Sequence, residues 1–348
     1  MAWSDIAGQD FAKRLLQTHL AGGQVANAYL LIGPEGVGKR RLAIEFAKAL
    51  NCEAPRRQAA ERSPERERLP QAHESRDDAS ASRPCDACPV CRQIMRATHP
   101  DLHLIVPGGA SDQIKIEQIR HLIGRVSLRP YSATIQVAII DGAERFTEEA
   151  ANSLLKILEE PPAHTRFLLT ATQVCACLPT IVSRCQVVRC EPLRAELVTQ
   201  ILLQGAHCEP RLAETIARLA GGSAARAIAL AGRWAAYEAA TSRLASESPA
   251  AWFERPLPET RDEVAQLVDG MLGWVRDLAL ATVDGTDRIA HAQHASVIGR
   301  QARGIEPDRC FALARELLAL RNSLEQFVSP RLVASLAREQ WLALRSDH

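Results

Sequence analysis

The sequence predicts an α/β domain followed by helices alone. Short apolar runs alternate with helix-like stretches as far as about residue 190, which is typical of a parallel sheet. The first of these runs ends in a glycine-rich loop that leads into a helical pattern. After residue 191 the strand-like runs end, and apolar residues recur at helical spacing.

Five apolar runs are expected to form the strands of the sheet. They occupy Tyr29–Gly33, Leu102–Val106, Gln136–Asp141, Phe167–Thr172 and Gln186–Arg189. The clearest helix covers Glu148–Glu160, because Thr147 can cap its first turn and two prolines stop it at Pro161. Strand, loop and helix therefore follow one another in the order that a phosphate-binding loop requires.

Three domains are expected from this pattern. An α/β domain spans 1–190, a small helical domain spans 191–245, and a second helical domain spans 246–348. The first domain contains a cysteine module over 52–91, interrupted by an insertion over 53–84. This insertion is rich in Arg, Glu, Ser, Ala and Pro and has one large aliphatic residue, so we predict that it is disordered.

Composition excludes some function classes. The formal net charge is +1 and aromatic residues make up 4% of the chain, which argues against a freestanding nucleic-acid-coating surface. No apolar run approaches the roughly 18 residues of a membrane helix, and the first residues lack an apolar secretory segment. We therefore expect a cytoplasmic protein with no membrane partner.

The loop that follows the first strand resembles a phosphate-binding loop with one part missing. Gly33, Gly36 and Gly38 permit a tight turn whose N–H groups can point at phosphate oxygens, and Lys39 adds positive charge. Arg40 stands where such loops carry the Ser or Thr that ligates Mg²⁺. The architecture of a nucleotide site is therefore predicted, but binding of ATP or ADP is in question.

A second part of that site is also changed. Asp141 ends a buried strand at the position that faces Mg²⁺ in such folds, and the alternative is a simple turn residue. Many ATPases place a glutamate immediately after this residue to polarise the attacking water, but Gly142 occupies the position here. Two independent losses in one site favour a chain that does not hydrolyse ATP.

Ten cysteines are present, and three of them are closely spaced. Cys85, Cys88 and Cys91 supply three soft ligands on one compact turn, and Zn²⁺ requires four in a tetrahedron. Cys52, at the end of the preceding helix, is the expected fourth ligand. Four cysteines leave no open coordination position, so we predict a structural zinc ion.

The motif around Arg184 carries little information alone. Ser183-Arg184-Cys185 lies between two apolar stretches near the end of the α/β domain. An exposed arginine there can place its charge on a phosphate held by a neighbouring subunit, as an arginine finger does. The alternative is a surface salt bridge.

Several stretches together resemble one protein family, the bacterial clamp-loader subunits of the AAA+ class. The resemblance is carried by Trp3, Ile6–Gln9, Asn27–Leu31, Gly33–Lys39, Phe46–Cys52, the cysteine cluster, His99–Asp101, Ala151–Pro162, Phe167–Thr172 and Ser183–Cys185. It is strong over residues 1–192, fair through the first helical domain and weak beyond. Ser323–Leu332 is similar to the family's last helices.

This resemblance implies the fold and the partners. The fold is an AAA+ P-loop domain with a helical lid and a helical collar, in a hetero-oligomer with gamma/tau and delta subunits. The assembly opens a sliding clamp and places it on primer-template DNA as part of DNA polymerase III. The degenerate nucleotide site then includes Gly33, Gly36, Gly38, Lys39, Asp141 and Thr172, and Arg184 acts as an arginine finger in trans.

The resemblance also bears on whether the chain is a motor. The family carries an arginine in the lid that senses nucleotide, and here Ala225 stands at that position with Arg226 one place later. We therefore expect a non-hydrolysing subunit without polymerase activity of its own. The alternatives are an active gamma/tau-like ATPase and a zinc-bearing nucleic-acid module.

Overall fold

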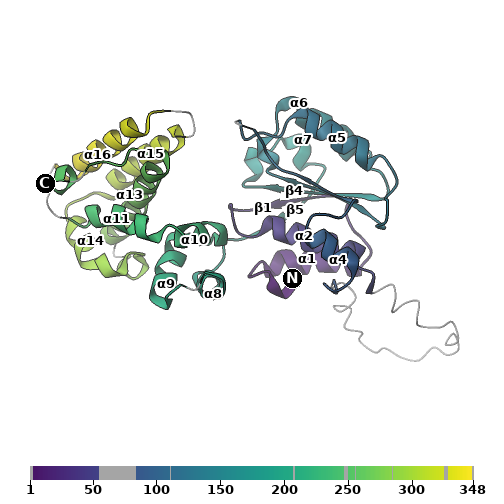
Figure 1. The fold of residues 1–348 in the computed structure, drawn as a ribbon, viewed down its shortest axis with the longest axis horizontal. Helices are drawn as coiled ribbons and strands as arrows, with labels where there is room; N and C mark the ends of the chain where they lie inside the picture. The colour runs from purple at the N-terminus through teal and green to yellow at the C-terminus, as the bar shows by residue number, and fades with distance from the viewer. Residues whose placement is uncertain are drawn as a thin grey trace. The chain divides into compact units, whose positions relative to one another are not determined.

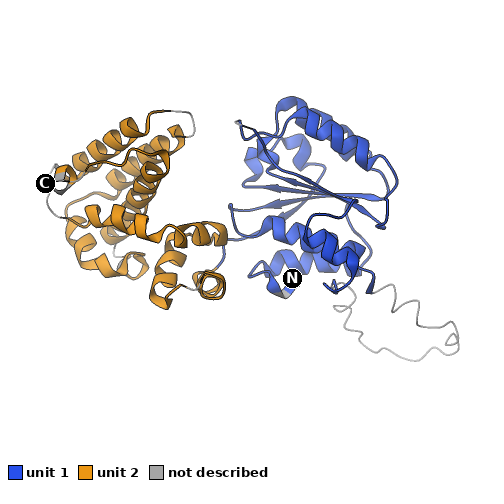
Figure 2. Cartoon of the chain, in the orientation of Figure 1, with its two compact units in different colours: residues 1–193 blue, residues 194–348 orange. Residues whose placement is uncertain are grey.

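The computed structural model describes residues 3–54, 84–109, 111–206, 208–246, 250–254, 256–283, 285–324 and 328–346. The chain forms two compact units, Met1–Leu193 and Arg194–His348 (Figure 2). The predicted disordered insertion over 53–84 lies mostly outside the described residues. The three predicted domains, with boundaries near 190 and 245, stay a prediction.

The first unit is built on one parallel sheet of five strands (Figure 1). Its strands are β1 (Ala28–Ile32), β2 (Leu102–Ile105), β3 (Gln136–Asp141), β4 (Thr165–Ala171) and β5 (Gln186–Arg189). They lie in the order β2-β3-β4-β1-β5, and every pairing is parallel. The predicted α/β fold class is confirmed, with strand ends within two residues of those expected.

Helices cover both faces of this sheet, as Figure 1 shows. They are α1 (Asp10–Ala21), α2 (Lys39–Asn51), α4 (Pro89–Met95), α5 (Ile116–Val126), α6 (Glu148–Glu159) and α7 (Pro179–Val182). Along β1, Tyr29 and Leu31 pack in the core beneath α1, α2 and α4, and Leu30 and Ile32 pack in the core beneath α5, α6 and α7. This alternation follows from the two-residue period of a strand.

Strand register brings the predicted nucleotide residues to one edge of the sheet. The last residue of β1 lies beside Ala171 of β4, and Asp141 of β3 lies beside Thr170. The glycine loop after β1, the aspartate that ends β3 and the turn after β4 therefore share the carboxyl edge. Ligands of open parallel sheets bind at this edge.

The second unit is helical throughout its described residues, as predicted. Its helices are α8 (Ala195–Gly205), α9 (Pro210–Leu219), α10 (Ala224–Ala231), α11 (Trp234–Leu244), α12 (Ala251–Glu254), α13 (Arg261–Thr282), α14 (Ala295–Gln301), α15 (Pro307–Ser323) and α16 (Pro330–Ser346). The long helix α13 packs against α11, α14, α15 and α16. Trp252, Trp274 and Trp341 are fully buried in this core. Among the described residues, no helix is both long and apolar enough to span a bilayer.

Candidate nucleotide site and metal centre

The glycine loop adopts a conformation that depends on its glycines. Gly36 and Gly38 have φ angles of 74° and 105°, which side chains with a Cβ rarely adopt. Gly33 is required for a different reason, because a Cβ there would lie 2.1 Å from the carbonyl oxygen of Cys190. Cys190 also donates its N–H to the carbonyl of Ile32. The loop is therefore held tightly against the end of β5.

Lys39, the first residue of α2, is turned back onto the loop. Its Nζ donates to the carbonyl oxygens of Gly33 at 2.6 Å and Pro34 at 2.8 Å. The residue is buried, and this burial lowers the pKa of its ammonium. The lysine that would hold phosphate in a working loop is thus occupied with the backbone of the loop itself.

Arg40 and Asp141 face one another at the carboxyl edge. The guanidinium NH1 of Arg40 lies 3.9 Å from Oδ2 of Asp141. The other carboxylate oxygen accepts a hydrogen bond from the Thr170 hydroxyl at 2.5 Å, and that hydroxyl oxygen accepts the Gly142 N–H. The carboxylate that would face a cation is therefore shared between a guanidinium and a hydroxyl.

The position after Asp141 differs in backbone as well as in side chain. Gly142 has a φ of 95°, and a Cβ there would lie 3.3 Å from the Pro107 ring. The nearby Glu144 accepts the backbone N–H of Thr172 at 3.2 Å. A glutamate therefore exists in this region, but its carboxylate supports the turn after β4.

Two residues that the sequence analysis did not single out as site residues support this edge. Thr170, and not Thr172, contributes the hydroxyl that contacts Asp141. Gln9 donates from Nε2 to the carbonyls of Val37 and Glu191, and its Oε1 accepts the N–H of Glu191. One side-chain amide thus fastens the glycine loop to the end of the first unit. Gln9 has a left-handed φ of 57° and immediately precedes α1.

The four predicted metal ligands come together at the start of α4. The sulfur atoms of Cys52, Cys85, Cys88 and Cys91 all lie within 4.8 Å of one another. A tetrahedral zinc site with Zn–S bonds of about 2.3 Å separates its sulfurs by about 3.8 Å. The donor set and its spacing therefore suit a metal ion of that kind.

Backbone N–H groups also point at three of these sulfurs. Cys85 donates to the sulfur of Cys52, Cys88 to that of Cys85, and Cys91 to that of Cys88, at 3.2–3.4 Å. Such bonds orient the ligands and spread the negative charge of a thiolate cluster. This arrangement results from the Cys-x-x-Cys turns, the second of which begins α4.

Protonation of the thiols responds to their surroundings. Burial raises the pKa of Cys52 and Cys91. Burial also acts on Cys85, but N–H groups of Cys88 and Ala87 outweigh it and lower its pKa to about 7. Four thiolates this close together require a cation to offset their charge.

A buried ion network joins the cysteine loop to α2. Lys48 is fully buried, and its Nζ lies 2.7 Å from Oε1 of Glu45 and also contacts the carboxylate of Asp86. Asp86 lies between two of the cysteines in a left-handed conformation. Burial disfavours the charge on Lys48, but both carboxylates outweigh that effect and raise its pKa. The sequence analysis missed this network.

The side-chain contacts of Arg184 are with α6 and α7 and not with the glycine loop. It follows α7, and its guanidinium pairs with the carboxylate of Glu159 at the end of α6. A second bond joins its NH1 to the carbonyl of Thr180 at 2.9 Å. About a third of its side chain is exposed, at 33%. In the isolated chain, Arg184 therefore forms a surface salt bridge, which is the alternative to a role as an arginine finger.

Comparison with known proteins places the chain in one family. A protein family described as DNA polymerase III, delta subunit, matches residues 8–75 and 69–194, which together cover more than half of the chain. The delta' subunit of DNA polymerase III from Pseudomonas aeruginosa is 34% identical over 213 residues, which are 61% of this chain and 58% of that protein. The tau subunit from Salmonella typhimurium is 32% identical over 233 residues, 66% of this chain and 32% of that protein. The chain thus spans less than two thirds of these relatives.

Solved structures are more distantly similar. One is a DNA polymerase III gamma subunit-related protein from Thermotoga maritima. The alignment covers 94% of this chain and 99% of that protein, with 15% sequence identity and a TM-score of 0.43. A likeness at this level does not bear on function.

Proposed function

Because the chain belongs to the family described as DNA polymerase III, delta subunit, we propose that it is a non-hydrolysing, delta-prime-type subunit of a clamp loader. In this role it maintains the AAA+ architecture to make subunit interfaces and does not itself turn over ATP. Its partners are gamma/tau and delta subunits, and through them the sliding clamp and primer-template DNA.

The contact between Arg40 and Asp141 carries this proposal. A cation at this edge needs a hydroxyl ligand after the loop lysine and a carboxylate at the end of β3. Arg40 removes the first and places its guanidinium 3.9 Å from the second. A positive side chain beside the carboxylate competes with Mg²⁺ for the same charge.

The turn at Gly142 supports the same conclusion independently. A general base that polarises water must reach the γ-phosphate region from this turn. The φ of 95° at Gly142 and the close approach of Pro107 disfavour any larger residue there. The backbone at position 142 therefore disfavours a glutamate, in agreement with the absence of the base from the sequence.

An active gamma/tau-like ATPase is the alternative. It is favoured by one observation, namely that a tau subunit matches this chain at 32% identity, close to the 34% of a delta' subunit. Overall similarity does not separate the two classes. The residues of the nucleotide site support the non-hydrolysing class, since a motor needs a hydroxyl after the loop lysine and a base after the aspartate, and Arg40 and Gly142 stand at those positions.

We propose that the cysteine cluster holds a structural Zn²⁺. Cys52, Cys85, Cys88 and Cys91 would be its ligands, and four thiolates leave no position for a water or a substrate. The ion would therefore stabilise the fold of the 84–95 segment against α2. It would take no part in catalysis.

We further propose that Arg184 acts in trans on the ATP site of a neighbouring motor subunit. The side chain is partly exposed, and its partner Glu159 has a side chain that is 51% exposed. An exposed ion pair contributes little to stability, so a phosphate can replace the carboxylate at small cost.

Nucleotide binding with and without Mg²⁺ tests the non-hydrolysing assignment. We expect any ATP binding by the purified chain to be indifferent to Mg²⁺. Arg40→Thr should make ATP bind about tenfold more tightly when Mg²⁺ is added, because a hydroxyl ligand returns and a competing charge leaves. The control is Arg41→Thr, which removes the adjacent exposed arginine and should change nothing. If Mg²⁺ strengthened ATP binding to the unaltered chain as much as to the Arg40→Thr variant, the assignment would be contradicted.

A further inference from the structure

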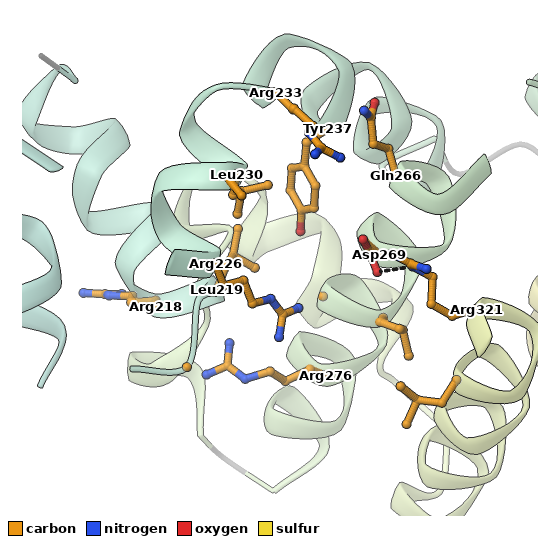
Figure 3. Close-up of a pocket in the computed structure, with 15 residues that line it drawn as sticks. Arg218, Leu219, Arg226, Leu230, Arg233, Tyr237, Gln266, Asp269, Arg276 and Arg321 are labelled. Carbon is orange, nitrogen blue, oxygen red and sulfur yellow. Dashed lines mark hydrogen bonds and ion pairs between the residues drawn. The ribbon is translucent and has the colours of Figure 1, made fainter. Parts of the chain in front are cut away.

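A cavity of about 480 Å³ lies within the helical second unit, lined by residues of α9, α10, α11, α13 and α15 (Figure 3). Its charged lining consists of Arg218, Arg226, Arg233, Asp269, Arg276 and Arg321. Five arginines therefore share the cavity with one carboxylate. Cavities of this size hold small molecules, and a lining of this charge selects anions.

The single aspartate does not neutralise the centre of the cavity. Asp269 accepts a hydrogen bond from Nε of Arg321 at 3.2 Å, so its charge is largely used by that partner. Arg218 donates to the carbonyl of Ile289 and extends away from the other labelled arginines in Figure 3. Within the residues that the structure describes, the side chains of Arg226 and Arg233 form no hydrogen bond or ion pair.

Two guanidinium groups converge in the cavity from different helices. Figure 3 shows the side chains of Arg226 of α10 and Arg276 of α13 entering the cavity from opposite sides. Arg276 lies 3.4 Å from a carboxylate oxygen of Asp277, but that fully buried carboxylate also accepts the N–H groups of Ala290 and His291. Like charges that face one another are stabilised by an anion between them.

The floor of the cavity is held rigid by a buried chain of hydrogen bonds. The hydroxyl of Tyr237 lies 3.1 Å from Nε2 of His291, and Nδ1 of the same ring lies 2.8 Å from Asp277. All three residues are buried. Tyr237 is therefore fixed in place, with its ring stacked between Trp234 and His291 and with Leu219 and Leu230 packed beside it. A rigid lining lowers the entropic cost of binding.

We propose that this cavity binds a small polyphosphate anion, of the class of pyrophosphate or the phosphate chain of a nucleotide. Guanidinium groups donate paired N–H groups to phosphate oxygens, and two arginines at convergent positions match two linked phosphates. Leu230 and Leu318, which also line the cavity, provide apolar surface that a nucleoside can use. The site goes beyond the proposed clamp-loader role, and it uses no residue of the glycine loop or the cysteine cluster and does not involve Arg184.

Calorimetric titration of sodium pyrophosphate into the full chain, without Mg²⁺, tests the site. The Lys39→Ala background is used throughout, so that the glycine loop contributes nothing. We expect saturation at one site per chain. Arg226→Gln and Arg276→Gln should each weaken binding by about 10- to 100-fold, the usual effect of losing a hydrogen bond to a charged group.

Arg211→Gln is the matched control, because Arg211 is an exposed arginine of α9 outside the cavity lining. It should leave the affinity unchanged, and thermal melting should show that every variant is folded. ADP titrated in parallel separates the two sources of the ligand, since tighter binding than pyrophosphate indicates a nucleotide and equal binding indicates a free polyphosphate.

Three results would overturn the proposal. The first is the absence of saturable pyrophosphate binding, and the second is binding that survives the double substitution Arg226→Gln with Arg276→Gln. The third is binding of a single-stranded oligonucleotide at concentrations where pyrophosphate does not bind, which would make the cavity part of a nucleic-acid surface. None of these results would affect the assignment of the glycine loop, because that loop is inactivated in the background used.

Discussion

At the carboxyl edge of the sheet, the charged side chains of the predicted nucleotide site contact other groups of the same chain. Lys39 donates to two carbonyls of its own loop, and Arg40 lies beside the carboxylate of Asp141. Both arrangements neutralise charge or satisfy donors that a nucleotide and its cation would otherwise meet. The glycines that shape the loop have a structural reason to remain, since Gly33 permits the close approach of Cys190.

The proposed role of Arg184 can be tested by substituting this residue. In a complex reassembled with motor subunits, Arg184→Ala should leave assembly intact and reduce DNA-stimulated ATP turnover at the affected site by roughly 10³-fold, as loss of an arginine finger does. Glu159→Ala is the control, because it removes the carboxylate that pairs with Arg184 and leaves the guanidinium free to act. Turnover should then be maintained. Unchanged turnover in the arginine variant would exclude the finger.

Among the elements, α2 and α4 are joined twice, through the cysteine cluster and through Lys48. The cysteines bring the end of α2 to the start of α4, and the buried lysine binds Asp86 of the intervening loop. A buried ion pair is costly to break on one side only, since the remaining charge is stranded. The two connections therefore stabilise the same contact.

A bound zinc ion is predicted where α2 and α4 meet. The purified chain should contain one zinc ion by elemental analysis, and a strong chelator should lower its melting temperature, because metal-binding free energy contributes to folding. Cys88→Ser should reproduce both effects, whereas Cys175→Ser, at an exposed cysteine outside the cluster, should produce neither. A fully folded, metal-free chain would refute the ligand assignment.

A pH-dependent contribution to stability is expected from the loop before β3. Asp101 accepts the backbone N–H groups of Tyr131, Ser132 and Ala133, and these bonds outweigh burial and lower its pKa below 3.8. A pKa that is lower in the folded state stabilises the fold above the unfolded value. That contribution is lost as pH falls through the folded value.

Asp101→Asn should therefore lower the free energy of unfolding at neutral pH by about 1–3 kcal/mol, the usual loss for hydrogen bonds to a charged group. The difference from the unaltered chain should shrink below about pH 4, where the unfolded carboxyl begins to protonate. Urea denaturation at several pH values measures both quantities. A difference that stays constant down to about pH 3 would mean that the charge of Asp101 is unimportant.

Across the whole molecule, the features that could be predicted from the sequence are those that depend on residues close together in the chain. The strand β3, the Thr147 cap of α6 and the Cys85–Cys91 turns each depend on a short local pattern, and the structure has all of them. Apolar alternation, capping and ligand spacing act over a few residues, which is why they can be recognised without the fold.

Contacts between distant residues could not be predicted in this way. Gln9 bonds Glu191 across 182 positions, and Lys48 meets Asp86 across the insertion. The arginines of the second-unit cavity come from several helices and show no shared spacing in the sequence. Such pairings exist only once the chain has folded, since no local propensity encodes them.

ATP turnover by the purified chain alone, with Mg²⁺ present, tests the central claim most directly. A subunit without the hydroxyl ligand and the base should show no turnover above that of its Lys39→Ala variant. Turnover that Lys39→Ala abolishes would contradict the account. The chain would then be a motor subunit, and the contact between Arg40 and Asp141 would have to open when nucleotide binds.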